Sequence, residues 1–215
     1  MTERYETTPA TELRRHPERG SYDRDVVHAI LDEALVCHLA YVHEGVPFSM
    51  PTAYARSGET IYVHGARANR SLAALAAGAP FSVSVMLLDG LVLARTAFHH
   101  SMNYRSVVAT GSARLVTTRE EKRDAMTLLV DRMAVGRSLA TRMPVDWELD
   151  VTQVLAIEIA HASAKLRAGG PLDVGQDRLH PCWSGVVPVR LVAGAPIAEP
   201  DVDASLAAPI VKIAG

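Results

Sequence analysis

The stretch FHHSMNYRSVVATG, residues 98–111, joins a polar segment to an apolar one. Its second half is rich in β-branched residues and is typical of a buried strand. Its first half brings two imidazoles, a phenol and a guanidinium to the start of that strand. Such ends are where a rigid scaffold presents polar groups to a ligand. The stretch therefore predicts a sheet protein with a ligand-binding mouth at this strand end.

Short apolar segments separated by turn residues surround this stretch on both sides. The expected strands are residues 35–43, 46–56, 60–65, 81–89, 91–98, 106–117, 151–159 and 185–192. Turns are expected at Glu44-Gly45, Ser57-Gly58-Glu59 and Asp89-Gly90. Many strands with short turns and few helices favour a closed or nearly closed antiparallel barrel, whereas a doubly wound sheet would need strands that alternate with helices.

A few helices are expected between these strands. Their ranges are residues 24–34, 69–77, 119–134 and 137–142, and residues 144–149 are expected to form a loop. Asp23 is the expected N-cap of the first helix. Thr118 and Glu121 have the spacing of a capping box for the third.

The bulk composition excludes several classes of protein. The chain has 215 residues, of which 48% are hydrophobic, and its formal net charge of −2 gives no electrostatic drive toward nucleic acid. No apolar run is long enough for a membrane span, and the charged N-terminal segment does not resemble a signal peptide. Two distant cysteines, Cys37 and Cys182, are expected to be reduced thiols in a cytoplasmic protein. The expected organisation is an N-terminal arm (1–24), one domain (25–195) and a flexible tail (196–215).

The segment YVHGARANRS, residues 62–71, has the composition of a phosphate site. A strand ends at His64, Gly65 allows a bend, and a helix begins near Asn69. A helix N-terminus offers free N–H groups and a partial positive charge to an anion. The side chains that add charge or a hydroxyl are Arg67, Arg70 and Ser71. The alternative is a capped helix with two solvated arginines.

Three other segments carry candidate functional residues. In MPTAY, residues 50–54, a proline within a strand indicates either an edge strand or a break that faces a ligand. Arg105 either contacts a ligand or forms a surface salt bridge. His99 and His100 would face opposite ways in a strand, and no Cys or carboxylate cluster accompanies them, so no metal site is predicted.

Three blocks in this order and spacing resemble the pyridoxamine 5′-phosphate oxidase-like flavoproteins, in particular their nitroimidazole-resistance-type branch. The blocks are FHHSMNYRSVVATG, HGARANR, and SAKLRAGG followed by WSGVVP, and the resemblance extends over roughly residues 14–195. It implies a β-barrel with helices, namely an antiparallel split barrel of the FMN-binding type. It also implies a homodimer with the cofactor sites at the subunit interface.

The resemblance also implies roles for particular residues. The helix start would hold the FMN phosphate, with Ser71 at the place of the family's lysine and Arg67 as compensation. The strand around Thr52 would bind the pyrimidine edge of the ring, and Trp183 would pack near the flavin. The implied cofactor-binding residues are Pro51, Thr52, Ala53, His64, Gly65, Arg67, Asn69, Arg70, Ser71, Tyr104, Arg105, Ser106, Val107, Lys165 and Trp183, and His64 and Lys165 are also the candidate catalytic residues.

The function expected from this resemblance is that of an FMN-dependent oxidoreductase acting on a small molecule. The family's Arg-x-His ending is not evident, which argues against pyridoxamine phosphate as the substrate. One alternative is a haem-binding split barrel in which His64, His99 or His100 is the axial ligand. Another is a flavin-binding dimer without catalytic activity. No Ser/His/Asp pattern indicates a hydrolase.

Overall fold

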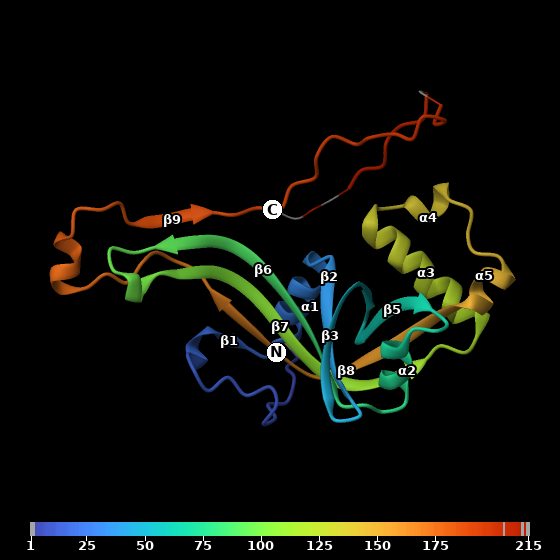
Figure 1. The fold of residues 1–215 in the computed structure, drawn as a ribbon, viewed down its shortest axis with the longest axis horizontal. Coiled ribbons are helices and arrows are strands. Elements are labelled where there is room, and N and C mark those ends of the chain that lie inside the picture. Colours follow the sequence, from blue (N-terminus) through green and yellow to red (C-terminus); the bar gives the residue numbers. More distant parts are fainter. Residues whose placement is uncertain (1–2, 204, 212, 214–215) are drawn as a thin grey trace. The chain divides into compact units, whose positions relative to one another are not determined.

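The computed structural model describes residues 3–203, 205–211 and 213, and shows a mostly antiparallel sheet with short helices (Figure 1). The strands are β1 (Gly20–Ser21), β2 (Val36–His43), β3 (Val46–Ala53), β4 (Ala55–Ser57), β5 (Thr60–Ala66), β6 (Phe81–Leu93), β7 (Ser101–Leu115), β8 (Thr152–Arg167) and β9 (Gly185–Pro188). The α-helices are α1 (Arg24–Glu33), α2 (Arg70–Ala76), α3 (Arg119–Met133), α4 (Arg137–Ala140) and α5 (Asp146–Val151). The 3-10 helices are η1 (Pro17–Arg19), η2 (Ala97–His99) and η3 (Gly175–Leu179). None of the described helices has the length and apolar character needed to cross a membrane.

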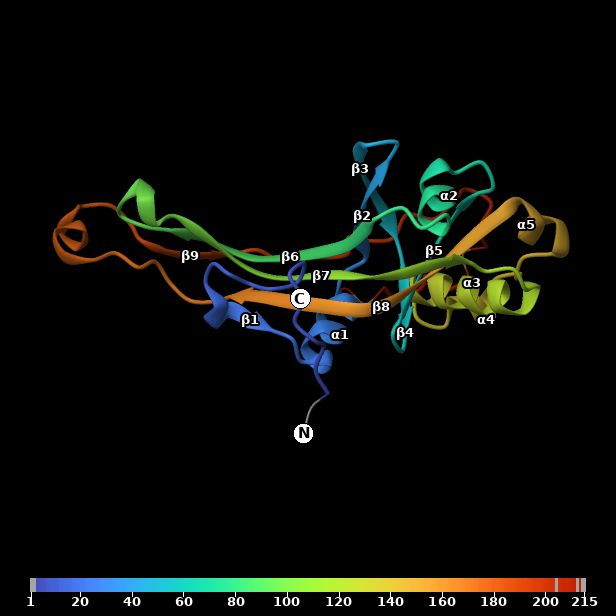
Figure 2. The same cartoon turned by 90° about the horizontal axis from the view of Figure 1, so that it is seen from below.

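The hydrogen-bonded strand order is β3-β2-β6-β7-β8-β5-β4, with β1 paired to β8 and β9 paired to β6. Figure 2 shows β6, β7 and β8 as the long strands of this sheet. The fold class expected from the sequence, an antiparallel sheet with few helices, is confirmed. The expected closure is not found, because β3 and β4 are the two ends of the order in the described chain.

The described chain forms two compact units, each assembled from three separate stretches. The first unit contains the described residues up to Ala34 together with residues 83–110 and 161–190. The second contains residues 35–82 and 111–160 together with the described residues from Leu191 onward. Residues 1 and 2 of the expected arm, and residues 204, 212, 214 and 215 of the expected tail, lie outside the described part.

In the first unit, β6 and β7 pair from Val83↔Ala109 to Val92↔Ser101. The expected turn at Asp89-Gly90 is wrong, because β6 continues through these residues with only a bulge after Leu88. The chain reverses instead at η2. A Cβ on Gly90 would lie 3.2 Å from a backbone oxygen of β9, so the glycine allows β9 to approach. Asp89 and Gly90 therefore lie within β6, where the glycine leaves room for β9, and they do not form a turn.

Asp23 occupies the N-cap position of α1, as expected, but its side chain does not cap the helix. The Asp23 side chain makes no capping hydrogen bond, and its carboxylate pairs with Arg4 at 2.9 Å. The helix is held by its buried face, formed by Val27, Ile30 and Leu31.

In the second unit, β2 and β3 form a hairpin whose turn is at Glu44-Gly45, as predicted. Both residues have positive φ values, 51° and 77°, which match the right-handed twist of the paired strands. Only the threonine half of the capping box predicted for α3 is present. The Thr118 hydroxyl accepts from the Glu121 N–H at 3.3 Å, whereas the Glu121 carboxylate binds Arg114 at 2.6 Å. A small core of Val116, Ala125, Val154 and Ala156 is completed by Tyr62 and Met126.

The loop expected at residues 144–149 is wrong, because α5 begins at Asp146. The Glu148 carboxylate accepts from the Val145 N–H at 2.9 Å and binds Arg142 at 2.8 Å. These contacts give the backbone and side chains at the start of α5 their hydrogen-bond partners. The helix is too short to show apolar periodicity in the sequence, so the loop was predicted from Pro144 alone.

The two cysteines differ in their exposure, and this predicts different reactivity. Cys37 is fully buried, which raises the pKa of its thiol to about 12, whereas Cys182 is exposed. Because the thiolate is the reactive form, we expect one thiol to react with a chromogenic disulfide reagent in native protein and two in denaturant. Equal rates for both thiols in native protein would contradict the burial of Cys37.

Candidate functional site

The helix start predicted at Asn69 is present, and its backbone donors are occupied. The Asn69 side-chain oxygen accepts from the N–H groups of Ser71 at 2.9 Å and Leu72 at 3.4 Å. A Cβ on Gly65 would lie 2.8 Å from the Asn69 side chain, so the glycine lets the helix begin close to β5. An anion at this turn would therefore be bound by side chains and not by these two amides.

Two aromatic rings lie beside the same turn. Tyr41 on β2 and Phe48 on β3 are cross-strand partners, and their rings stack with centroids 5.3 Å apart. The Tyr41 and Ser71 hydroxyls lie 2.9 Å apart. The Arg70 guanidinium carbon lies 4.9 Å from the Phe48 ring centroid, a cation–π distance. The structure thus brings Arg70 and Ser71 together on an aromatic surface.

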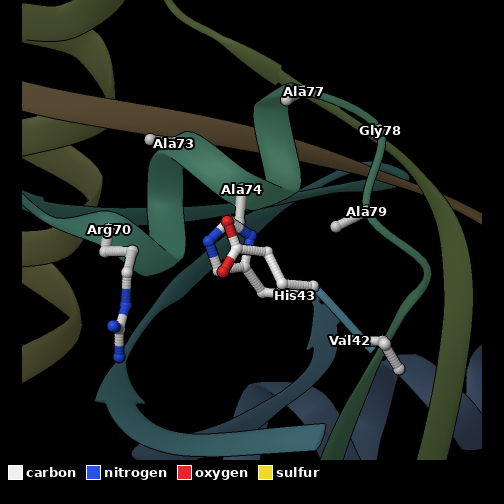
Figure 3. Close-up of a pocket in the computed structure, with 9 residues that line it drawn as sticks. Val42, His43, Arg70, Ala73, Ala74, Ala77, Gly78 and Ala79 are labelled. Atoms are coloured by element: carbon white, nitrogen blue, oxygen red, sulfur yellow. The ribbon is translucent and has the colours of Figure 1, made fainter. Parts of the chain in front are cut away.

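A pocket of about 490 Å³ opens next to this cluster (Figure 3). Figure 3 shows Arg70 extending from the first turn of α2 and His43 from the end of β2. The rest of the wall consists of Val42, Glu44, Ala73, Ala74, Ala77, Gly78 and Ala79. A carboxylate, an imidazole and a guanidinium around an alanine face make this a pocket of mixed charge.

The predicted ring-edge residues lie on β3, which is an edge strand, one of the two alternatives that Pro51 left open. Pro51, Thr52 and Ala53 pair with β2, and β3 is one end of the strand order. At an edge, the N–H that proline lacks is not needed for a second strand. The Thr52 hydroxyl donates to the Ala53 carbonyl at 3.3 Å. Their contact with a flavin remains a prediction.

His64 is the predicted site residue whose hydrogen bonding is incomplete. It lies on β5 opposite Val154 of β8 and is half-buried. Its Nδ1 is buried and has no hydrogen-bond partner among the described residues. Burial lowers the pKa of the imidazole from its ordinary value near 6.5, so the ring is neutral at pH 7 with a free lone pair.

Arg67 lies in a different pocket from Arg70. It is exposed and lines a pocket of about 420 Å³ with Lys122 and Thr152. The Lys122 ammonium donates to the carbonyls of Leu149 at 2.7 Å and Thr152 at 2.8 Å. The two arginines are thus not side by side in one pocket, and compensation by Arg67 remains a prediction.

In the first unit, Tyr104 and Lys165 line a common pocket of about 610 Å³ together with His99 and His100. The Ser106 hydroxyl donates to the Lys165 carbonyl at 3.2 Å, which ties β7 to β8. His100 Nδ1 lies 2.8 Å from the carbonyl oxygen of Thr96. The polar segment 98–104, where the sequence predicts a ligand-binding mouth, therefore contributes residues to a pocket.

Arg105 lies next to this segment and is already bound to two carboxylates. Its guanidinium donates to both oxygens of Glu33 and to both oxygens of Asp89. Hydrogen bonds to Glu33 and then to Asp89 raise the Arg105 pKa further above its ordinary value. A flavin phosphate would have to compete with both carboxylates. Val107, two residues further along, is a core residue and is 1% exposed.

Arg105→Ala is expected to lower the free energy of unfolding by about 2–3 kcal/mol, because Glu33 and Asp89 lose their shared partner in a half-buried site. Arg119→Ala is the matched control, since Arg119 also binds two carboxylates but all three side chains are at least 50% exposed. Its expected effect on stability is much smaller, because exposed ion pairs contribute little. Urea denaturation measures both values, and equal losses would contradict the structural role of Arg105.

Trp183 is 63% exposed and is not part of the core. Its ring lies within 2.9 Å of where a Cβ on Gly185 would be, so the glycine accommodates the indole. The neighbouring Ser184 hydroxyl donates to Asp173 at 2.7 Å, which holds the segment. An exposed tryptophan on a segment fixed by hydrogen bonds is typical of a protein–protein interface. Its contact with a flavin remains a prediction.

The sequence-based reasoning missed Arg167, which is 8% exposed and lines the same pocket as Lys165. Its guanidinium donates to Asn103 Oδ1, to the Gly169 carbonyl at 3.4 Å and to the Gly170 carbonyl at 3.2 Å. The available signal was its position in SAKLR, two residues after Lys165 and so on the same face of the strand. Among the described residues, no group of three or more His, Cys, Asp or Glu is placed to bind a metal ion.

Comparisons with known proteins agree with this architecture. A sequence family described as pyridoxamine 5'-phosphate oxidase matches residues 23–166. No curated protein sequence matches.

Two solved structures are similar over nearly the whole chain. The structure of the flavocytochrome Anf3 from Azotobacter vinelandii has 35% sequence identity and a TM-score of 0.87, and the match covers 94% of each chain. The FAD and heme binding protein from Mycobacterium smegmatis has 36% identity and a TM-score of 0.84, covering 89% of this chain and 94% of that one. A 5-nitroimidazole antibiotic resistance protein from Bacteroides thetaiotaomicron VPI-5482 has 18% identity, a TM-score of 0.58 and coverage of 68% and 85%, and shares the fold.

Proposed function

Because this chain belongs to the pyridoxamine 5′-phosphate oxidase family, we propose that it is a redox protein that binds a flavin together with haem. The proposal is supported by two relatives with 35% and 36% identity, one named as a flavocytochrome and the other as an FAD and heme binding protein. The observation that carries it is the state of His64. A neutral imidazole is one of the groups that bind haem iron, and burial lowers the pKa of His64 and so favours its neutral form.

His64 fits an iron ligand on three grounds. Its imidazole is neutral near pH 7, so its lone pair is available to a metal. It is half-buried on a rigid strand, which limits its motion. Its Nδ1 is a buried polar atom without a partner, which costs free energy unless a bound group changes the surroundings of the ring.

His99 and His100 are less suitable as axial ligands. They lie at the mouth of the first unit's pocket, and His100 is exposed to water. His100 Nδ1 also lies 2.8 Å from the Thr96 carbonyl oxygen, so this ring atom already has a partner. We therefore assign the ligand role to His64 and propose that the two other histidines contact anionic groups.

The flavin would be held by residues predicted from the sequence. In the second unit, Arg70 and Ser71 would bind its phosphate on the aromatic surface, and the β3 backbone at Thr52 would bind the ring edge. When bound, flavin and haem supply hydride and electron transfer, and the protein supplies binding, orientation and charge. We propose FAD as the flavin in place of FMN, because the relative with 36% identity is named as an FAD and heme binding protein.

We further propose that the protein is a homodimeric oxidoreductase that acts on a small molecule in the cytoplasm. The dimer is supported by large apolar side chains that remain exposed on the first unit, among them Met86 at 60% and Trp183 at 63%. Light scattering should give twice the mass of the chain, and a monomer would contradict the interface site.

The proposed function is tested by the absorbance spectrum of the protein as isolated, followed by chromatography of the released cofactors. Flavin bands and a Soret band in one preparation, with FAD as the released flavin, are expected. A preparation that shows neither band and takes up neither added cofactor would overturn the proposal. FMN as the released flavin would support the flavin site and overturn the choice of FAD.

Arg70→Ala is expected to weaken flavin binding by about 1.5–3 kcal/mol, because a charge-assisted contact to phosphate is lost. Arg123→Ala is the control, since Arg123 is an exposed arginine of the same unit that pairs with Asp146. Fluorescence titration of flavin into cofactor-free protein measures both. Unchanged affinity in Arg70→Ala would remove Arg70 from the site.

A further inference from the structure

The 610 Å³ pocket of the first unit is strongly basic. Four cations line it, namely Arg15, Arg19, Lys165 and Arg167, and the described lining residues include no acidic side chain. It adjoins a second pocket of about 290 Å³, which shares Arg19 and Arg167 with it. A concave site with clustered charge of one sign attracts an ion of the opposite sign more strongly than scattered surface charges do.

Arg167 is the buried member of this cluster and has no anionic partner. Among the described residues its guanidinium contacts only neutral acceptors, the side chain of Asn103 and the carbonyls of Gly169 and Gly170. These contacts orient the guanidinium but do not neutralise it. Burying an uncompensated charge is costly, so an anion bound in the pocket would relieve that cost.

Two of the remaining cations, Arg15 and Arg19, come from the N-terminal segment, and the third, Lys165, lies on β8. The Lys165 ammonium donates to the Arg15 carbonyl at 2.9 Å, which ties this segment to the strand. Two carboxylates lie near the pocket without lining it. Glu18 lines only the adjoining pocket and lies 3.6 Å from Arg19 and 3.0 Å from His16, and Asp173 follows the lining residue Leu172 and accepts from the Arg95 N–H at 2.9 Å. Two carboxylates do not balance four cations, so the pocket keeps a net positive charge.

We propose that this pocket binds the diphosphate group of a nucleotide. A diphosphate carries more negative charge than a single carboxylate, and its oxygens match the planar donor pairs of several arginines. The opening also has apolar and aromatic side chains, Phe98, Tyr104 and Leu172, of which Phe98 is 88% exposed. Such surfaces suit the flat base attached to the diphosphate.

Two molecules could provide this group. One is a free nucleotide, which would leave the flavin phosphate on Arg70 and Ser71. The other is the dinucleotide flavin proposed above, whose diphosphate would then lie in this pocket and not on Arg70 and Ser71. The site itself stands on the first unit alone and does not depend on haem ligation by His64. Calorimetry with ADP as the probe separates the sources. It is carried out on the protein as isolated and again after its bound small molecules have been removed, with circular dichroism as the check on folding.

ADP should bind at least one of these forms, and adenosine, which lacks the diphosphate, should not. If ADP binds the protein as isolated, the natural ligand of the pocket is a free nucleotide. If ADP binds only after the bound small molecules have been removed, and FAD competes with it, the natural ligand is the flavin. The double variant Arg15→Ala/Arg19→Ala should weaken ADP by about tenfold or more, the equivalent of one lost charge-assisted contact. Arg14→Ala is the control, since Arg14 pairs with Glu12 and does not line the pocket.

The proposal is overturned if ADP binds neither form, or if the double variant and Arg14→Ala bind ADP equally. Failure of the proposed redox function would appear elsewhere, as a protein without flavin or haem bands, and would leave the ADP titration unaffected. Arg167 is not substituted in this test because its burial makes loss of folding the expected result.

Discussion

Gly111→Ala is expected to lower the free energy of unfolding by about 4 kcal/mol or more, enough to prevent folding of a marginally stable chain. Gly111 lies on β7, and a Cβ there would be 1.8 Å from the Glu158 carbonyl oxygen of β8. It would also be 2.9 Å from the Ala160 nitrogen. Both obstacles are backbone atoms, so relief requires the strands to separate and not a change of rotamer.

The matched control is Gly170→Ala. Gly170 has no atom within 4 Å of an added Cβ and no positive φ value, so its substitution should change stability by less than about 0.5 kcal/mol. Thermal and urea denaturation of both variants measure the difference. A well-folded Gly111→Ala protein with unchanged stability would contradict the packing of β7 on β8.

His64→Ala is expected to abolish the haem bands of the purified protein while flavin is retained. The imidazole is the proposed axial ligand, and alanine offers no atom that binds iron. Added imidazole should restore a Soret band in the variant, because a free ring can occupy the space that the side chain left. This rescue separates loss of the ligand from loss of the fold.

His161→Ala is the control for this experiment. His161 is another half-buried histidine whose Nδ1 is buried and unpartnered, but it lies on β8 in the first unit. If His64 binds iron, His161→Ala keeps the Soret band. Haem bands that persist unchanged in His64→Ala would exclude this ligand and favour the histidines of the first unit.

Turn and helix-cap residues were predicted correctly where the neighbouring residues allow only one structure. Glu44-Gly45 lies between two alternating strands and forms the hairpin turn, and Asn69 forms the cap of α2. Pro51 indicated either an edge strand or a break that faces a ligand, and β3 is an edge strand. In each case neighbouring residues determine the outcome, so sequence-based reasoning could reach it.

Predictions failed where distant residues decide the structure. Asp89-Gly90 has the composition of a turn, but the Asp89 carboxylate binds Arg105 and the glycine lets β9 approach. The basic pocket was missed for a similar reason. Arg15 and Arg167 are far apart in the sequence, and only the pairing of β1 with β8 brings the N-terminal segment to that strand.

The central claim is that this chain binds a flavin and haem together, and native mass spectrometry of the protein as isolated tests it most directly. The account predicts a dimer whose mass exceeds that of two chains by flavin and haem in equal number, and His64→Ala should lose only the haem increment. A dimer or monomer with the mass of the bare chain, which stays unchanged after incubation with FAD and haemin, would contradict the account.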